Sequence, residues 1–326
     1  MKLQDIFTKK PNILVVGDIM LDVFIRGNAL RISPEAPIPV VSHVKTSNQL
    51  GGAANVACNL VKWNAEVEMF GAFGNDEKGA EILKLTKSQN IRLGADCGGG
   101  GRATITKVRV IAGPQHVCRV DFEDSPQAYA PSETQIAQII SAIDRADAVV
   151  VSDYAKGFIT EELMRQVVEK CNRTGKVLCV DPKPRNKISY KNPYLLKPNK
   201  KEALELAGLS VDAIFKYPTE EVCGRIFEKY SPKYLVITLG EDGMLLADKS
   251  GIKKVLPSRV LSVFDVSGAG DTVVSMLAFA LACGMDIEAA MAAASTAAGI
   301  VVGKAGTAQA EISEILGYEN EPTFGK

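Results

Sequence analysis

The chain has 326 residues and carries 38 acidic and 38 basic side chains, so its formal net charge is zero. A protein that binds nucleic acid in general carries a basic excess, and this balance argues against that class. Hydrophobic residues make up 46% of the chain, which is enough to bury a large core without a metal or a disulfide as a staple.

Cysteine usage and the lack of long apolar runs bear on where the protein works. The seven cysteines are odd in number and form no CxxC pair, which indicates a reducing compartment. The N-terminal residues 1–10 are polar and lack the apolar core of a signal peptide. The longest apolar runs, at 273–285 and 289–302, fall short of the roughly 20 residues of a spanning helix. We expect a cytoplasmic protein with no membrane partner.

The first third of the chain predicts one buried strand and several strands of a smaller sheet. Ile13–Val16 is a β-branched run that ends in Gly17 and Asp18, which indicates a buried strand with a carboxylate at the edge where open α/β sheets bind ligands. Prolines at 34, 37 and 39 suggest a stiff connection in a small β-layer beside the main sheet. Further strands are expected at Leu21–Arg26, Ile38–Lys45, Glu66–Phe73, Thr104–Ile111 and Val117–Phe122, and helices at Ala53–Trp63 and Glu77–Gln89.

From Pro131 onward, helical and strand patterns alternate, which is typical of a parallel sheet with crossover helices. Helices are expected at Glu133–Arg145, Glu161–Thr174, Lys200–Ala207 and Thr219–Lys229, and strands at Ala148–Ser152, Val177–Asp181, Tyr194–Lys197 and Tyr234–Leu239. A hairpin at Met244–Val255 and two helices rich in small residues, Asp271–Cys283 and Asp286–Val302, complete the pattern.

The segment Asp265–Thr272 carries the strongest chemical signal. Gly268 and Gly270, on either side of Ala269, let the backbone turn tightly and present its amides to an anion. The N-terminus of the following helix faces the same place, which suits the charge of a transferring phosphoryl group. Asp271 can accept a proton from a substrate hydroxyl there. The alternative is a simple turn in which Asp271 caps the helix.

A second glycine-led helix start lies at Gly51–Asn55. Small residues here allow a ligand close to the backbone of Gly51 and Gly52, and Asn55 can bind sugar hydroxyls. The alternative is a close contact between helix and sheet. Neither GxxxxGK[ST] nor a GxGxxG after the first strand occurs, so neither a P-loop NTPase nor a dinucleotide oxidoreductase is supported.

Weaker signals follow the later strands. Asn199 and Glu202 share one helical face and could position Mg²⁺ through water, since Mg²⁺ keeps several of its waters. The alternative is an N-cap with a capping-box glutamate. Lys183 can steer phosphates at another strand end. Thr238, Gly240 and Gly243 end a further strand and can border a nucleotide.

Taken together and in this order, the motifs resemble the ribokinase-like carbohydrate kinases, or PfkB family, over nearly the whole chain. Gly51–Asn55 resembles the N-terminal signature of that family, and Asp265–Thr272 resembles the C-terminal one, with Asp271 in the place of the catalytic base. Asn199–Glu202, which includes Lys200 and Lys201, resembles its NxxE motif and is assigned to the nucleotide.

A narrower resemblance is to the bacterial heptose-7-phosphate kinases of ADP-heptose synthesis. It is carried by Arg31–Val41, Val120–Glu123 and Ser152–Gly157. These kinases use ATP to phosphorylate the anomeric hydroxyl of D-glycero-β-D-manno-heptose 7-phosphate, on the route to the lipopolysaccharide core. Some are fused to an adenylyltransferase, and the chain resembles the unfused form.

The resemblance implies a single ribokinase-like α/β domain over 1–326, with a mostly parallel sheet flanked by helices. A discontinuous β-lid is expected at about 18–49 and 102–123, and lids in this family often pair across a homodimer. ATP and Mg²⁺ are the implied cofactors. Monovalent-cation activation also occurs in the family, and no residue is assigned to such an ion here.

The resemblance also implies roles in an in-line phosphoryl transfer. Asp271 would take the proton, and the amides of Gly268–Asp271 would stabilise charge. Asp18 and Asn55 would hold sugar hydroxyls. The basic side chains expected to meet the phosphate of the substrate are Arg31, Lys107 and Arg109.

Three rival functions remain at this point. The first is a kinase of another sugar, such as ribose or a fructose phosphate, and Arg31–Val41 argues against it. The second is a non-catalytic sugar-binding or regulatory protein on the same fold, which the intact Gly268, Gly270 and Asp271 make improbable. A nicotinamide oxidoreductase is a distant third.

Overall fold

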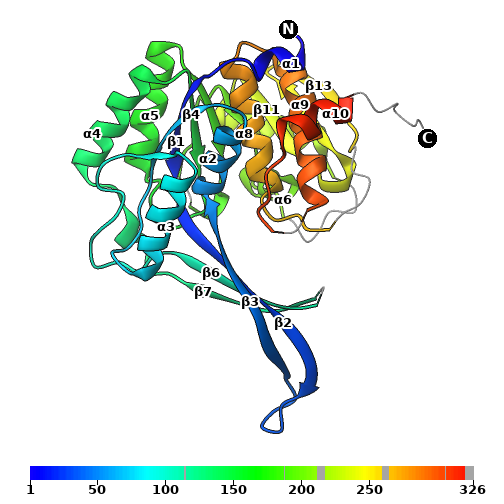
Figure 1. The fold of residues 1–326 in the computed structure, drawn as a ribbon. Helices are drawn as coiled ribbons and strands as arrows, with labels where there is room; N and C mark the ends of the chain where they lie inside the picture. The colour runs from blue at the N-terminus through cyan, green and yellow to red at the C-terminus, as the bar shows by residue number, and fades with distance from the viewer. Residues whose placement is uncertain (114, 187, 211–216, 259–263, 305, 320–326) are drawn as a thin grey trace.

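The computed structural model describes residues 1–326 except 114, 187, 211–216, 259–263, 305 and 320–326. In this part of the chain, a nine-stranded sheet with helices on both faces forms the body, and a four-stranded sheet projects from it (Figure 1). Residue 114 belongs to the expected lid segment 102–123 and lies outside the described residues.

The main sheet has the strand order β13-β12-β11-β10-β9-β8-β1-β4-β5. The strands from β11 to β5 are parallel, and β12 and β13 form an antiparallel hairpin at one edge. The strands are β1 Asn12–Gly17, β4 Glu66–Phe70, β5 Arg92–Leu93, β8 Ala148–Ser152, β9 Val177–Asp181, β10 Leu195–Leu196, β11 Tyr234–Thr238, β12 Met244–Asp248 and β13 Gly251–Leu256. The expected parallel sheet and its terminal hairpin are confirmed, and β5 was not anticipated.

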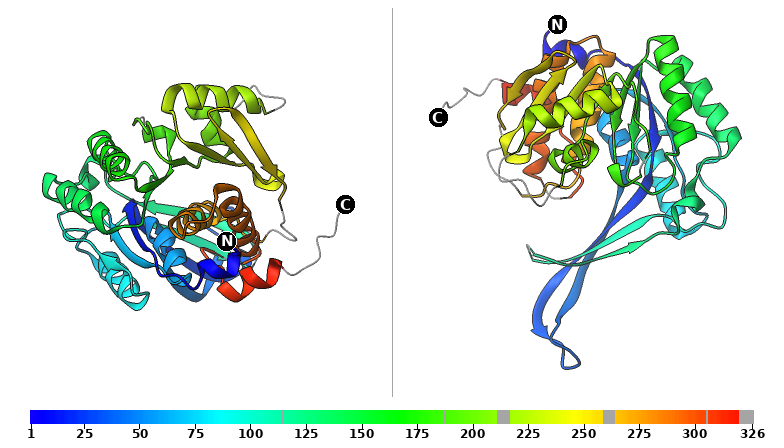
Figure 2. Two further views of the ribbon diagram at one scale, coloured as in Figure 1. Left: turned by 90° about the horizontal axis from the view of Figure 1, so that it is seen from above. Right: turned by 180° about the vertical axis from the view of Figure 1, so that it is seen from behind.

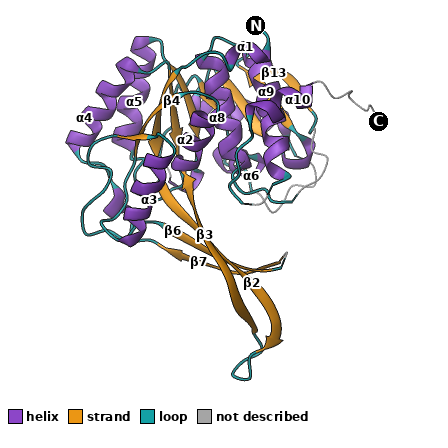
Figure 3. Ribbon diagram, viewed as in Figure 1, coloured by secondary structure: helices purple, strands orange, loops and turns teal. Residues whose placement is uncertain are grey.

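Helices cover both faces of this sheet (Figure 3). The helices are α1 Leu3–Ile6, α2 Ala53–Lys62, α3 Glu77–Ser88, α4 Glu133–Ala142, α5 Glu161–Thr174, α6 Lys200–Leu206, α7 Thr219–Tyr230, α8 Ala269–Ala282, α9 Ile287–Val302 and α10 Ile312–Glu319. Short 3₁₀ turns are η1 Pro126–Tyr129, η2 Ile143–Arg145, η3 Pro184–Asn186 and η4 Gly240–Asp242. No described helix has both the length and the apolar character needed to cross a membrane.

The two faces of the sheet bury two separate hydrophobic cores. One core contains residues of α2, α8 and α9, and the other contains residues of α4, α5, α6 and α7. Successive side chains of β1 alternate between them, because Ile13 and Val15 join the first core whereas Leu14 and Val16 join the second. This burial on both faces explains the unbroken apolar run that predicted the strand.

The projecting sheet has the order β3-β2-β6-β7, and its strands are β2 Ile19–Ile32, β3 Pro39–Gly52, β6 Thr106–Ala112 and β7 Gln115–Phe122. Both β2 and β3 have 14 residues, twice the length of β6, so they are much longer than the sequence suggested. Pairing with β6 ends at Gly27, and the rest of the β2–β3 hairpin extends away from the body, as the views in Figures 1 and 2 agree.

The parallel strands end at one edge of the main sheet and deliver polar residues there. Asp18 follows β1, Asp153 follows β8, and Lys197 follows β10, whereas Asp181 is the last residue of β9. Since the carboxyl ends of parallel strands meet at the same edge, this is where an open α/β sheet forms its ligand site.

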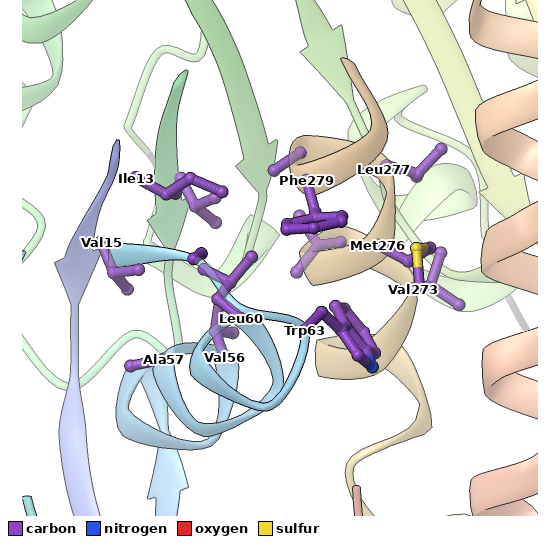
Figure 4. Packing of buried hydrophobic residues seen from close by; sticks show 14 of the residues in the cluster. Ile13, Val15, Val56, Ala57, Leu60, Trp63, Val273, Met276, Leu277 and Phe279 are labelled. Atoms are coloured by element: carbon purple, nitrogen blue, oxygen red, sulfur yellow. The ribbon is translucent and has the colours of Figure 1, made fainter. Parts of the chain in front are cut away.

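Phe279 of α8 lies at the centre of the first core (Figure 4). Its ring is fully buried, with its centroid 5.8 Å from that of Phe7 and 6.2 Å from that of Trp63. We predict that Phe279→Ala lowers the free energy of unfolding by about 3–5 kcal/mol, the usual cost of such a cavity. Urea denaturation measures this. The control Leu83→Ala, at a half-exposed position, should change stability by less than about 0.5 kcal/mol. Equal effects for both variants would contradict the assignment of this core.

Candidate active site

A cavity of about 930 Å³ opens at the carboxyl edge of the main sheet, beside the N-terminus of α8. It is lined by all the residues that the sequence assigned to catalysis and to the nucleotide. These are Lys183, Asn199, Lys200, Lys201, Glu202, Thr238, Gly240, Gly243, Gly268, Ala269, Gly270 and Asp271. Thus three strand ends and one helix start, far apart in the sequence, meet at one cavity.

Asp271 is the third residue of α8 and is only 3% exposed. Its Oδ2 accepts a hydrogen bond from Asn55 Nδ2 at 2.8 Å, and its Oδ1 accepts one from the hydroxyl of Tyr154 at 2.6 Å. Burial raises the pKa of Asp271, whereas these two hydrogen bonds and the charge of Lys197 oppose that rise. The carboxylate is therefore oriented by two donors inside a site that disfavours its charge, as is typical of a general base.

Backbone conformation and close packing explain why glycines precede Asp271. Gly268 is the N-cap of α8 with a φ of 80°, a conformation that glycine adopts without strain. A Cβ atom there would lie 2.8 Å from Asn55 Nδ2, so a side chain would also disturb the bond that orients Asp271. Gly270 and Asp271 belong to the first helical turn, whose amides have no partner within the helix and point toward an anion. The alternative in which Asp271 caps the helix is wrong, because Gly268 is the N-cap and the carboxylate of Asp271 binds Asn55 and Tyr154 instead.

A buried ion pair lies next to this turn. Lys197 Nζ is 2.7 Å from Asp181 Oδ2 and also donates to the carbonyl oxygen of Gly270 at 3.3 Å. Burial raises the pKa of Asp181 to about 7, against the attraction of Lys197. Lys197 thus places a cation between Asp181 and the catalytic turn, and both ends of the pair line the cavity.

The Asn199–Glu202 motif forms a complete capping box at the start of α6. Asn199 Oδ1 accepts from the amide of Glu202 at 2.9 Å, and Glu202 Oε2 accepts from the amide of Asn199 at 2.9 Å. The other carboxylate oxygen, Oε1, pairs with Lys183 Nζ at 2.7 Å. The capping alternative is therefore confirmed. Glu202 also lines the cavity, and its role in Mg²⁺ binding stays a prediction.

Asp18 and Asn55 make hydrogen bonds within the protein that the sequence did not indicate. Asp18 accepts hydrogen bonds from the amides of Tyr154, Lys156 and Phe158, so both its oxygens hold one loop. Asn55 donates to Asp271 and accepts from Gln309 Nε2 at 3.1 Å. The contact of these two residues with sugar hydroxyls stays a prediction, because their described partners are protein atoms.

Gly51 and Gly52 end β3 and enter α2 where the chain passes close to the carboxylate of Asp22 and the backbone carbonyl of Asp18. A Cβ atom on Gly51 would lie 2.5 Å from Asp22 Oδ2, and one on Gly52 would lie 2.4 Å from the carbonyl oxygen of Asp18. Gly52 also has a φ of 59°. Close packing thus accounts for both glycines, as the alternative explanation held.

The three basic residues expected at the substrate phosphate are not brought together. Lys107 lies over the ring of Tyr154, with Nζ 5.5 Å from the centroid, and burial lowers its pKa. Arg109, two residues along β6, pairs with Asp22 at 2.5 Å. Arg31 lies beyond the last β2 residue that pairs with β6, and its side chain is exposed. Within one chain the long hairpin separates Arg31 from the cavity, so its contribution stays a prediction.

Sequence analysis gave no individual role to four residues of this site. Tyr154 contacts Asp271, Lys197 and Asp181 form the buried pair, and Asp22 lies buried beside Gly51. A usable signal existed for Lys197 and Asp181, since each is a charged residue at the end of a buried strand. Tyr154 lies in Ser152–Gly157, a segment noted only for its resemblance, and nothing in the sequence marks its contact with Asp271.

Comparison with known proteins agrees with this geometry. Residues 10–314 match the model of the pfkB family of carbohydrate kinases. The chain is 41% identical over 320 residues to the bifunctional protein HldE of Sulfurimonas denitrificans, an alignment that covers 98% of this chain and 66% of that protein. The chain therefore spans about two thirds of the length of this relative.

Solved structures with the same fold include two ribokinases. The ribokinase of Giardia lamblia is 19% identical with a TM-score of 0.75, covering 95% of this chain and 100% of its own. The ribokinase of Arabidopsis thaliana, complexed with ribose and ATP, is 18% identical with a TM-score of 0.71, covering 96% and 100%. These likenesses confirm the ribokinase-like α/β fold, and the family match extends over both Asp271 and the capping-box motif. The chain belongs to the pfkB family of carbohydrate kinases.

Proposed function

We propose that this sugar kinase transfers the γ-phosphoryl group of ATP to a hydroxyl of a sugar phosphate, with Asp271 as general base. The observation that carries the proposal is the position of Asp271. Its buried carboxylate, held by Asn55 and Tyr154, opens to the cavity beside the amides of the first turn of α8. A base next to a site for negative charge is what in-line phosphoryl transfer requires.

The proposed reaction uses groups that are already in place. Asp271 accepts the proton of the acceptor hydroxyl as the oxygen attacks the phosphorus atom. The amides of Gly270 and Asp271 stabilise the charge on the transferring group, because they face it without an intrahelical partner. Lys197 adds a cation at the same turn, within 3.3 Å of the carbonyl of Gly270. The acceptor oxygen thus loses its proton to Asp271 and forms a bond to the γ-phosphorus, while the bond from this phosphorus to ADP breaks on the opposite face and ADP leaves.

The cavity suits a nucleotide in shape and chemistry. Its lining includes four basic side chains, Lys183, Lys197, Lys200 and Lys201, together with a set of apolar residues. The apolar lining residues are Leu239, Met244, Val266, Val273, Ala298 and Val302. We assign the basic part to phosphates and the apolar part to the base of ATP.

Asn199 and Glu202 fit Mg²⁺ held through water. Each Glu202 oxygen has one described donor and can accept a further hydrogen bond from a water molecule. Mg²⁺ usually keeps several waters and is bound by few protein groups together with substrate phosphates. When bound, the ion would neutralise charge on the phosphates.

For the acceptor, we propose the anomeric hydroxyl of D-glycero-β-D-manno-heptose 7-phosphate. The product would be the 1,7-bisphosphate, a step of ADP-heptose synthesis for the lipopolysaccharide core, in the cytoplasm. The support is the resemblance of Arg31–Val41, Val120–Glu123 and Ser152–Gly157 to heptose-7-phosphate kinases, together with the 41% identity to HldE. The alternative acceptor is another sugar, such as ribose or a fructose phosphate, and no observation of the site favours it.

Within one chain, Lys107 is the best placed candidate for the phosphate of the substrate. Its side chain lies over Tyr154, whose hydroxyl touches the base, so the ammonium group stands beside the position proposed for the sugar. Burial lowers the pKa of Lys107, and an anion nearby would restore it. Arg109 is engaged by Asp22 and would have to exchange that partner.

A homodimer through the four-stranded sheet is also proposed. The outer part of the β2–β3 hairpin carries exposed apolar side chains at Leu30, Ile32, Ile38 and Val44. Val117, Val120 and Phe122 of β7 are exposed as well, so a monomer would leave these apolar side chains in water. A second copy of the same sheet would cover this surface and protect its edges.

The first prediction from this proposal concerns the base. Asp271→Asn keeps the size of the side chain but removes the proton acceptor, so turnover should fall at least ~10²-fold. ATP binding, measured by calorimetry, should be largely retained. The matched control is Asp286→Asn, because Asp286 caps α9 and asparagine caps equally well. Near-normal turnover of Asp271→Asn would remove this residue from the mechanism.

The second prediction concerns the acceptor. Phosphorus NMR of products from heptose 7-phosphate, free heptose, ribose and fructose 6-phosphate should show a clear preference for the first. Free heptose should react at least about 10²-fold less efficiently, since it leaves a buried cation unpaired. Lys107→Met should raise the KM for the sugar phosphate far more than the KM for ATP. A preference for ribose or fructose 6-phosphate would refute the heptose assignment and leave the kinase assignment standing.

The third prediction concerns assembly. Light scattering should show a dimer for the unmodified chain, and the double variant Leu30→Ser, Ile38→Ser should shift it toward monomer because both positions are exposed and apolar. Leu83→Ser, on α3 and also exposed, serves as the control and should leave the dimer intact. A monomeric unmodified chain at micromolar concentration would show the dimer proposal to be wrong.

A further inference from the structure

The loop Asp153–Phe158, between β8 and α5, is held to the end of β1 by one buried carboxylate. Asp18 is 1% exposed, and it accepts hydrogen bonds from the amides of Tyr154 at 2.8 Å, Lys156 at 3.1 Å and Phe158 at 3.1 Å. Three bonds to one carboxylate fix the path of the backbone from Tyr154 to Phe158.

The loop is also held on its other sides. Asp153 Oδ1 accepts from the amide of Ala155 at 2.6 Å, and Asp153 Oδ2 accepts from the hydroxyl of Tyr190 at 2.5 Å. Lys156 pairs with Glu123, which directly follows β7, so the loop is connected to the four-stranded sheet as well. The loop is thus bound to both sheets.

Tyr154 connects this loop to the base. Its hydroxyl donates to Asp271 Oδ1 at 2.6 Å, while Lys107 of β6 lies over its ring at 5.5 Å. Burial raises the pKa of Tyr154 well above its usual value, so the hydroxyl stays protonated and remains a donor at neutral pH. The phenol cannot swing away without losing both contacts.

The two donors to Asp271 come from opposite sides. Asn55 from α2 occupies Oδ2, and Tyr154 from the β8–α5 loop occupies Oδ1, so the plane of the carboxylate is set. A carboxylate oxygen can accept two hydrogen bonds, and each one therefore keeps a lone pair for a substrate hydroxyl.

We propose that Tyr154 is a positioning residue for the transfer: its hydroxyl holds the carboxylate of Asp271 in the orientation that accepts the proton of the acceptor hydroxyl. The inference rests on the proposed role of Asp271 as general base. It assigns a function to the Ser152–Gly157 segment, which the proposed mechanism otherwise leaves without one. Lys107 and Lys156 connect the same loop to the four-stranded sheet. The position of that sheet therefore also affects the orientation of the Asp271 carboxylate.

Tyr154 also affects the pH at which the carboxyl group of Asp271 ionises. The charged or titratable groups that act on Asp271 are Tyr154 from the loop, Lys197 after β10, Asp22 from β2 and Asp181 from β9. Lys107 of β6 acts on the ring of Tyr154. Burial raises the pKa of Asp271, and the bond from Tyr154 opposes the rise. Removing this bond therefore raises the pKa further, so the base becomes protonated at a higher pH.

The test compares Tyr154→Phe with Tyr190→Phe in the full chain. Both variants remove one phenol oxygen that supports the same loop, but only Tyr154 touches Asp271. For Tyr154→Phe we expect a loss in kcat of about 10-fold, unchanged KM values, and an acidic limb of the kcat–pH profile moved up by about one pH unit. One hydrogen bond to a charged group supports a shift of that size. Tyr190→Phe should lower the melting temperature and leave the acidic limb in place.

A second measurement does not depend on activity. Carbon NMR of carboxyl-labelled aspartate, with Asp271→Asn for assignment, should show a higher pKa for Asp271 in Tyr154→Phe than in the unmodified chain. An unchanged pKa together with an unchanged acidic limb would refute the inference. A lower sugar KM with kcat retained would also refute it, because the phenol would then compete with the substrate. If the unmodified chain phosphorylates no sugar at all, the proposed function fails, and the NMR titration still decides the role of Tyr154.

Discussion

The buried carboxylate of Asp271 is the constraint on which the site depends. A charge taken out of water is costly unless donors compensate for it, and here Asn55 and Tyr154 each supply a hydrogen bond. Both donors must then be placed by their own surroundings. Gly268 leaves room for the amide of Asn55, and Asp18 holds the backbone that carries Tyr154. A single aspartate thus requires α2, the β8–α5 loop and the start of α8 to meet within hydrogen-bonding distance.

The main sheet makes this meeting possible because its parallel strands end together. β1, β8, β9 and β10 each deliver a charged residue at the same edge, so charged groups distant in sequence become neighbours. The Asp181–Lys197 pair shows the consequence, since burial raises the pKa of Asp181 to about 7 while Lys197 stays within 2.7 Å.

The four-stranded sheet contributes to two separate regions of the molecule. Its inner part brings Lys107 and the Asp22–Arg109 pair to the region of the base, and its outer part exposes apolar side chains to solvent. The same two strands, β2 and β3, therefore connect the region of the proposed acceptor with the proposed dimer surface.

The sequence alone determined the fold class and the parallel sheet, and it singled out Asp271 as the candidate base. Continuous β-branched runs and alternating helices carry that information locally, and Gly268–Asp271 combines a turn, a helix start and a carboxylate in four adjacent residues. Only the tertiary structure decided what surrounds Asp271. Asn55 was predicted for sugar and is found on the base, and the capping box of Asn199 and Glu202 is complete. Arg31 was grouped with Lys107 because both are basic. The structure places Arg31 on the outer part of the β2–β3 hairpin, which is longer than the strand patterns predicted. The physical reason is that periodicity reports burial along one element, whereas hydrogen bonds between side chains depend on how separate elements pack.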